Sequence, residues 1–195
     1  MSEPVVPSPE VALPPRRPSV RLMFSHPAHL VSFGAGSGLS PVMPGTVGTL
    51  WGWLVFAALD DVWGRGPQAD LYWVLTLCLG WLVGWWACTR TAQALRVADP
   101  GSVVWDEVWA IWLVLWLASP VDWRGELLAV IAFRLFDMVK AGPVGWADAL
   151  FKARPGQPIG WAQGLGIMFD DLVAAACTLL VLALAVAWRQ GGPLV

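Results

Sequence analysis

Five apolar stretches constrain the fold of this chain more than any other feature. They lie at roughly 43–59, 71–88, 103–119, 126–140 and 167–188. Most are near the lower end of the roughly 17–25 residues that a membrane-spanning helix needs, and the fourth is short. A strand with an open edge would leave backbone groups without hydrogen bonds in lipid, so helix is the expected state. We therefore predict an all-α, multi-pass membrane protein with about four to five hydrophobic helices.

The composition supports a membrane location and argues against a nucleic-acid partner. Hydrophobic residues make up 57% of the chain and charged residues 13%, whereas a soluble domain has roughly 25% charged residues. The 15 tryptophans also support a membrane location, because Trp favours the membrane–water boundary. The net charge is −2 and no basic run occurs, so no nucleic acid is expected as a partner.

The basic residues predict the domain organisation and the orientation. Residues 1–25 are rich in Pro and Arg, and we expect a disordered cytoplasmic tail followed by one helical membrane domain over 26–195. Threading five spans from a cytoplasmic tail places a larger basic group on the cytoplasmic side: Arg16, Arg17, Arg21, Arg90, Arg96, Lys140, Lys152 and Arg154. Only Arg65, Arg124 and Arg189 fall on the far side, and Arg134 lies within the fourth stretch. This bias follows the positive-inside rule.

Carboxylates interrupt three of the apolar stretches: Asp106, Glu107, Asp137, Asp170 and Asp171. A charge at bilayer depth costs about 3 kcal/mol even on the lenient insertion scale, so such residues usually face a partner, a cavity or an ion. The third and fifth stretches would start at the cytoplasm and the fourth would end there. We therefore expect the five acids to form one polar site that faces the cytoplasm.

The two adjacent acid pairs point to a divalent cation. Two acidic pairs on neighbouring helices would repel each other unless a positive charge lay between them, and hard oxygen ligands suit Mg²⁺. We predict that Asp170, Asp171 and one of the pair Asp106/Glu107, with Asp106 preferred, bind this metal. The alternative for each pair is a first-turn acid that complements the helix dipole, which is worth roughly 0.3–1 kcal/mol.

Arg134, Asp137 and Lys140 follow at a spacing of three, which places them along one helix face. Arg and Lys beside a carboxylate–metal site could clamp a phosphate. The alternative is a structural Arg–Asp pair, with Lys140 extending to the membrane boundary. We weigh the two equally.

The Gly-rich stretch 34–49 supplies the candidate substrate-binding residues Ser37, Ser40 and Thr46. Small residues let a backbone approach an anion closely, but such stretches are equally often tight turns or helix contacts, and no Gly-Lys-Ser/Thr triplet of a P-loop is present. His26 and His29 precede the stretch; an interfacial or capping role is favoured over a metal pair.

Four motifs in this order resemble the phosphatidylglycerophosphatase A family. They are GSGLSPVMPGTVGT (36–49), DPGSVVWDE (99–107), FRLFDMVK (133–140) and GLGIMFDDLVA (164–174), and the resemblance runs from about His26 to about Leu184. This chain differs from the family at Lys140-Ala141-Gly142-Pro143, where the family often has Lys-Pro-x-Pro. The exit from the fourth helix is therefore expected to differ in shape.

The resemblance implies a Mg²⁺-dependent enzyme of the bacterial inner (cytoplasmic) membrane. Its reaction would be hydrolysis of the membrane lipid phosphatidylglycerophosphate to phosphatidylglycerol and inorganic phosphate, with 26–195 as the catalytic domain. The family's acidic positions fall on the five acids and its basic positions on Arg134 and Lys140. No obligate protein partner is implied.

On this hypothesis Glu107 or Asp137 is the general base, while Arg134 and Lys140 stabilise charge on the transferred group. Whether water or an aspartate is the nucleophile stays open. Two other classes also remain. A small cation carrier or channel would use the same acids as an ion path, and a membrane scaffold would use them only in structural ion pairs.

Overall fold

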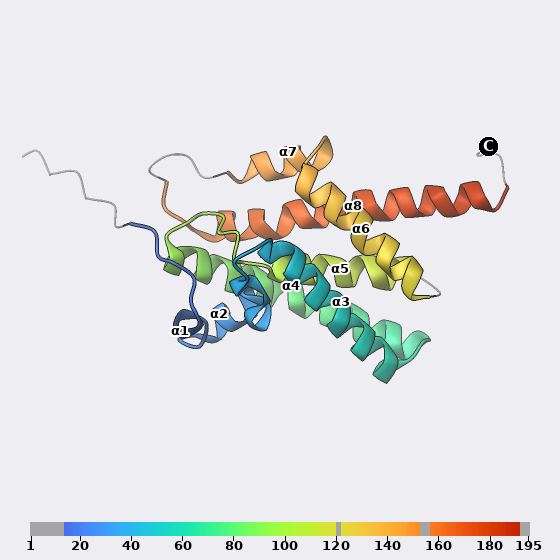
Figure 1. Ribbon diagram of the computed structural model, residues 1–195, viewed down its shortest axis with the longest axis horizontal. Coiled ribbons are helices and arrows are strands. Elements are labelled where there is room, and N and C mark those ends of the chain that lie inside the picture. Colours follow the sequence, from blue (N-terminus) through green and yellow to red (C-terminus); the bar gives the residue numbers. More distant parts are fainter. Residues whose placement is uncertain (1–13, 120–121, 153–156, 192–195) are drawn as a thin grey trace, which may run out of the picture.

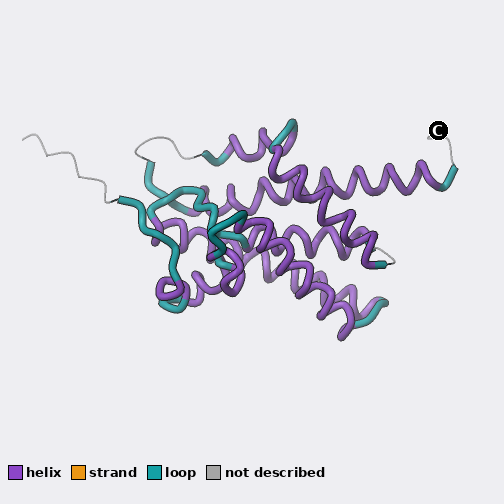
Figure 2. The backbone as a smooth tube through the Cα atoms, in the orientation of Figure 1, coloured by secondary structure: helices purple, strands orange, loops and turns teal. Residues whose placement is uncertain are grey.

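The structure, a computed structural model, describes residues 14–119, 122–152 and 157–191, and every regular element in these ranges is a helix. The all-α expectation is therefore confirmed for this part of the chain (Figures 1 and 2). The short N-terminal elements are α1 (Val20–Met23), α2 (Pro27–Ser32) and the 3-10 helix η1 (Gly34–Leu39). The others are α3 (Pro44–Trp63), α4 (Pro67–Leu95), α5 (Trp105–Ala118), α6 (Trp123–Val139), α7 (Pro143–Leu150) and α8 (Trp161–Arg189).

Helix α5 is the centre of the bundle. It contacts α3, α4, α6 and α8, and half of its 14 residues are buried. At 1.5 Å per residue it is about 21 Å long, shorter than the roughly 30 Å of a bilayer core. Its indole N–H groups bond to carbonyl oxygens of the surrounding helices: Trp112 Nε1 to Gly52 O at 2.8 Å and Trp109 Nε1 to Leu77 O at 2.8 Å.

Glycines on α3 allow this close packing. A Cβ atom at Gly52 would lie 2.8 Å from Ile111 Cγ2, and one at Gly48 would lie 2.6 Å from Val104 Cβ. Small residues at helix contacts are typical of membrane bundles, where van der Waals contact replaces the hydrophobic effect between helices. The contact fixes the rotation of α5 and hence the direction of the side chains in its first turn.

The outer surface of the bundle is apolar. Within the described ranges, α4 and α8 are long and apolar enough to cross a membrane, and only 33% and 22% of their most apolar windows are buried. The core helix of a soluble protein would be mostly buried, so this exposure favours contact with lipid. The shorter α3 and α6 also present large apolar side chains outward: Leu50, Leu54, Leu128, Ile131 and Leu135. These features indicate a membrane protein; the count of four to five spans stays a prediction.

The start of the last helix and the presence of α7 differ from the sequence prediction. The last helix begins at Trp161 rather than near 167, so Asp170 and Asp171 lie about three turns inside it. The helix-dipole alternative is therefore wrong for this pair, whereas Asp106 and Glu107 do lie in the first turn of α5. Helix α7 was not predicted at all.

The segment 14–25 is ordered, contrary to the expected disorder of the whole tail. Arg16 N donates to Leu95 O at 2.8 Å, and the Arg96 guanidinium donates to Pro14 O at 3.1 Å. Both bonds join this segment to the end of α4. Residues 1–13 of the predicted tail lie outside the described residues.

Candidate active site

Three carboxylates from two helices form a compact cluster. Asp106 and Glu107 come from the first turn of α5, and Asp171 comes from the interior of α8. One oxygen atom of each lies within 4.8 Å of the others. We call these three residues the carboxylate cluster. Residues more than 60 positions apart in the sequence thus meet at one end of the bundle.

Each member of the cluster has a buried oxygen with no hydrogen-bond partner among the described residues: Asp106 Oδ1, Glu107 Oε2 and Asp171 Oδ2. Buried polar atoms are almost always paired, because an unpaired one loses its water without compensation. Three neighbouring carboxylates that each carry an unpaired oxygen form a donor set that suits a hard divalent cation such as Mg²⁺. The residues present therefore fit the metal that the resemblance implies.

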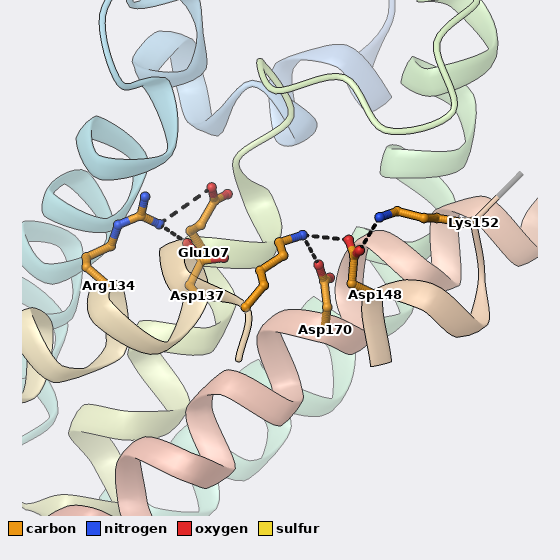
Figure 3. A network of polar contacts seen from close by, with 7 residues as sticks. Glu107, Arg134, Asp137, Asp148, Lys152 and Asp170 are labelled. Carbon is orange, nitrogen blue, oxygen red and sulfur yellow. Dashed lines mark hydrogen bonds and ion pairs between the residues drawn. The ribbon is translucent and has the colours of Figure 1, made fainter. Parts of the chain in front are cut away.

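Arg134 and Asp137 of α6 lie beside the cluster. The Arg134 guanidinium donates to Asp137 Oδ2, and its Nη1 atom is 3.8 Å from Glu107 Oε1 (Figure 3). The carboxyl groups of Asp137 and Asp171 are close enough to interact. Arg134 Nε is buried and unpaired within the described part of the chain. Arg134 is therefore held against the cluster and still has a free donor.

Asp170 lies outside the cluster, in a second group of charges. Lys140 Nζ is 2.7 Å from Asp170 Oδ2 and 2.7 Å from Asp148 Oδ1, and Lys152 Nζ is 2.6 Å from Asp148 Oδ2. Figure 3 shows the Asp148 carboxylate between Asp170 and the Lys152 ammonium group. This arrangement binds α7 to α8 through Lys140 at the end of α6.

The charge of Asp148 is stabilised by this arrangement. Burial opposes ionisation of the carboxyl, but hydrogen bonds from Lys140 and Lys152 outweigh it and hold the pKa of Asp148 below its usual value. Beside this group lies a cavity of about 200 Å³ whose polar walls are Asp99, Asp148, Lys152, Gln163 and Asp170. Asp170 therefore lines this cavity and also pairs with Lys140.

The Gly-rich stretch contributes one of its three candidate residues to the site region. Ser37 Oγ donates to Gly34 O at 2.9 Å and Ser40 Oγ to Val42 O at 2.8 Å, so both hydroxyls close local turns. Thr46 Oγ1 is buried with no partner in the described ranges. Its neighbour Gly45 packs on the site, because a Cβ atom there would collide with Glu107 Oε1 and lie 3.2 Å from Arg134 Nη2.

The histidines have structural contacts. His26 Nδ1 accepts from Ala28 N at 3.1 Å and caps α2, which confirms the capping interpretation. His29 Nδ1 lies 2.9 Å from Thr91 Oγ1 of α4.

Sequence reasoning missed Asp148, Lys152 and the contact of Gly45. The Asp148–Lys152 spacing of four residues is a recognisable signal for a helical ion pair. Pro143 at the first helical position is a signal for the start of α7. No signal in the sequence identifies Gly45 among the glycines of the stretch 34–49.

The fold and the site define a class: a helical membrane protein with a buried carboxylate site, suited to a divalent cation and flanked by a guanidinium suited to phosphate. The family model described as phosphatidylglycerophosphatase A matches residues 30–186. The chain belongs to the phosphatidylglycerophosphatase A family.

Curated relatives agree with this assignment. The chain is 37% identical over 157 residues to phosphatidylglycerophosphatase A of Escherichia coli, covering 79% of this chain and 80% of the relative. It is 32% identical over 164 residues to the protein of that name from Haemophilus influenzae, covering 84% and 91%. A third relative, from Bacteroides thetaiotaomicron, is 33% identical, with 80% and 91% covered, and is provisionally named a phosphatidylinositol-3-phosphatase. No solved structure matches the chain.

Proposed function

We propose that this protein hydrolyses phosphatidylglycerophosphate to phosphatidylglycerol and inorganic phosphate, and that the reaction requires Mg²⁺. The observation that carries the proposal is the carboxylate cluster, with an unpaired buried oxygen on each member and Arg134 beside it. The names of two relatives support the choice of substrate. Nothing observed favours a cation carrier.

Asp106, Glu107 and Asp171 would hold the metal, so Glu107 takes the place that the sequence prediction gave to Asp170. When bound, Mg²⁺ would polarise a phosphoryl oxygen and offset charge on the transferred group. Asp170 then has a positioning role, because its ion pair with Lys140 holds α6, α7 and α8 together.

The phosphate would bind between Arg134 and the start of α3. The unpaired Arg134 Nε and Thr46 Oγ1 are donors, and the backbone N–H groups in the first turn of this 20-residue helix add further donors and the positive end of its dipole. Gly45 contacts both Glu107 and Arg134, so the start of α3 lies against the cluster. These donors are suited to the oxygens of a phosphate monoester.

Asp137 is the candidate general base, because it lies outside the cluster and interacts both with Arg134 and with Asp171. A water molecule attacks phosphorus and gives a proton to the Asp137 carboxylate. The bond between phosphorus and the glycerol oxygen breaks, and the proton becomes available to that oxygen as it leaves. Arg134 orients Asp137 throughout.

The membrane would supply the substrate directly. The acyl chains would lie in the bilayer along the apolar outer surface of the bundle, while the head group reaches the cluster from the cytoplasmic side. The positive-inside bias of the sequence supports this orientation. The bacterial relatives support a location in the bacterial inner membrane, as a multi-pass protein.

Phosphate release from purified protein in lipid–detergent micelles tests the proposal. We expect release from phosphatidylglycerophosphate with Mg²⁺, loss of release with a chelator, and recovery when Mg²⁺ is restored. Asp171→Asn should lower the rate by about a hundredfold, or ~3 kcal/mol. Asp61→Asn is the matched control, because Asp61 is exposed near the far end of α3. Unchanged turnover in Asp171→Asn would remove Asp171 from the site, and faster release from phosphatidylinositol 3-phosphate would overturn the head-group assignment.

A further inference from the structure

A groove lies at the end of the bundle opposite the carboxylate cluster. Helix α5 ends at Ala118, whereas α8 continues to Arg189 and α6 begins at Trp123 (Figure 1). Between these helices are two hollows of about 580 and 680 Å³ that share Ala118, Leu182 and Val186 in their walls. The shared walls make them one groove, which exists because α5 is shorter than its neighbours.

The groove is apolar along its length and basic at its mouth. Leu117, Leu128 and Leu179 line its interior. Arg124 and Arg189 line the larger hollow, and no ion pair joins either guanidinium to a carboxylate within the described ranges. Asp122 is also in the wall, but its Oδ1 accepts from Gly125 N at 2.9 Å and so caps α6. The mouth therefore carries two guanidinium groups and one carboxylate, so these three residues leave a net positive charge.

Tryptophans place this mouth at the depth of lipid head groups. Trp123 is 62% exposed and Trp188 is 81% exposed, and each precedes one of the two arginines. Exposed Trp is typical of the membrane–water boundary. Arg189 lies 18 residues along α8 from Asp171, so the mouth is about 27 Å from the carboxylate cluster. The groove therefore opens in the leaflet opposite the one from which the substrate would be taken.

We propose that this groove is a binding site for an anionic phospholipid. An acyl chain occupies the apolar part, and Arg124 and Arg189 bind the phosphate and the anionic head group. A volume of about 680 Å³ is within the range of ligand sites, roughly 300–1,000 Å³. A transmembrane helix of a partner would fill the apolar part equally well but would leave both arginines without counter-charges. The site goes beyond the proposed phosphatase function and does not depend on it.

Lipid retention in native mass spectrometry tests the site. The probe is phosphatidylserine, which has no phosphate monoester, added to protein purified with phosphatidylcholine. We expect retention of phosphatidylserine over phosphatidylcholine, with a drop of about fivefold for each of Arg124→Gln and Arg189→Gln. Ala185→Trp should also displace the lipid, because it fills the groove without changing the charge. Phosphate release by all three variants should stay at the wild-type rate.

Arg65→Gln is the matched control, since Arg65 is the other basic residue expected on that side and lies at the turn between α3 and α4. Equal loss of phosphatidylserine in Arg65→Gln would show that general surface charge attracts the lipid, and would overturn the site. If phosphatidylserine is retained in the double variant Arg124→Gln/Arg189→Gln and also in Ala185→Trp, the groove is ordinary lipid contact and the site is overturned. Either result leaves the phosphatase proposal intact.

Discussion

Gly45 is the residue through which α3 approaches the carboxylate cluster. In Gly45→Ala the new Cβ would collide with the Glu107 carboxylate, which is the end of a flexible side chain and can move. We therefore expect the helix to accept the methyl group while Glu107 leaves its position. Displacement of a site group by about 1 Å can cost a hundredfold in rate, so phosphate release should fall by about that factor while the unfolding temperature changes little.

Gly101→Ala is the control for this prediction, because a Cβ atom at Gly101 would meet nothing within 4 Å. It should leave the rate at the wild-type value. If Gly45→Ala and Gly101→Ala release phosphate equally fast, the start of α3 does not contribute to the site.

At the level of residues, the sequence could identify the acids of the site but not their grouping. Acids inside apolar helices need a counter-charge or an ion. The direction of each helix then predicted that the acids meet at the same end of the bundle. Adjacent helical positions point about 100° apart, so the rotation of each helix decides which acid faces the centre. Gly48 and Gly52 help to set that rotation in α5, and Lys140 draws Asp170 away from the cluster. Such contacts join distant segments and leave no local pattern.

Helix α2 contains a titratable contact with α4. Burial, and then the charges of His26 and Arg16, lower the pKa of His29 below its usual value. Below the usual pKa of about 6.5, the His29 imidazole therefore binds a proton more readily in the unfolded chain than in the folded one. The stabilising contribution of neutral His29 is therefore complete above about pH 6.5 and is lost as pH falls through the lower folded-state value.

Thermal unfolding between about pH 7.5 and about pH 5.5 measures this effect. The unfolding temperature of the wild type should fall over this range, and His29→Gln should flatten the dependence. His26→Asn is the control, because Asn also caps helices and leaves His29 in place; its pH dependence should persist. A slope that is the same with and without His29 would exclude this contact as its source.

At the level of elements, the hydrophobic stretches predicted the long helices, and the errors lie at their ends. The segment GWAQGLG (160–166) resembles a loop because of its glycines, yet most of it is the start of α8. Gly164 packs on Thr89 and Gly166 packs on Phe151. Glycine here serves close packing rather than a turn, and only the neighbouring helix reveals the difference. Helix α7 is short; it buries Val144 and Ala147, and its Asp148 pairs with Lys140 and Lys152.

For the whole molecule, the account requires that the cluster and the turn between α3 and α4 lie on opposite sides of the membrane. In a variant with Cys78, Cys88 and Cys177 replaced by alanine, single cysteines at Lys152→Cys and Arg65→Cys report the two sides. A membrane-impermeant maleimide should label Arg65→Cys in intact bacterial cells and Lys152→Cys only after the membrane is opened. Labelling of both from the same side would contradict the proposed orientation.

The most direct measurement of the central claim is cation binding by the cluster, with Mn²⁺ as a spectroscopic substitute for Mg²⁺. Electron paramagnetic resonance should show bound Mn²⁺ in the wild type and in Asp170→Asn. Binding should be lost in Asp106→Asn, Glu107→Gln and Asp171→Asn. Loss of Mn²⁺ in Asp170→Asn together with full binding in Glu107→Gln would contradict the account, because the metal would then be held by a different set of carboxylates.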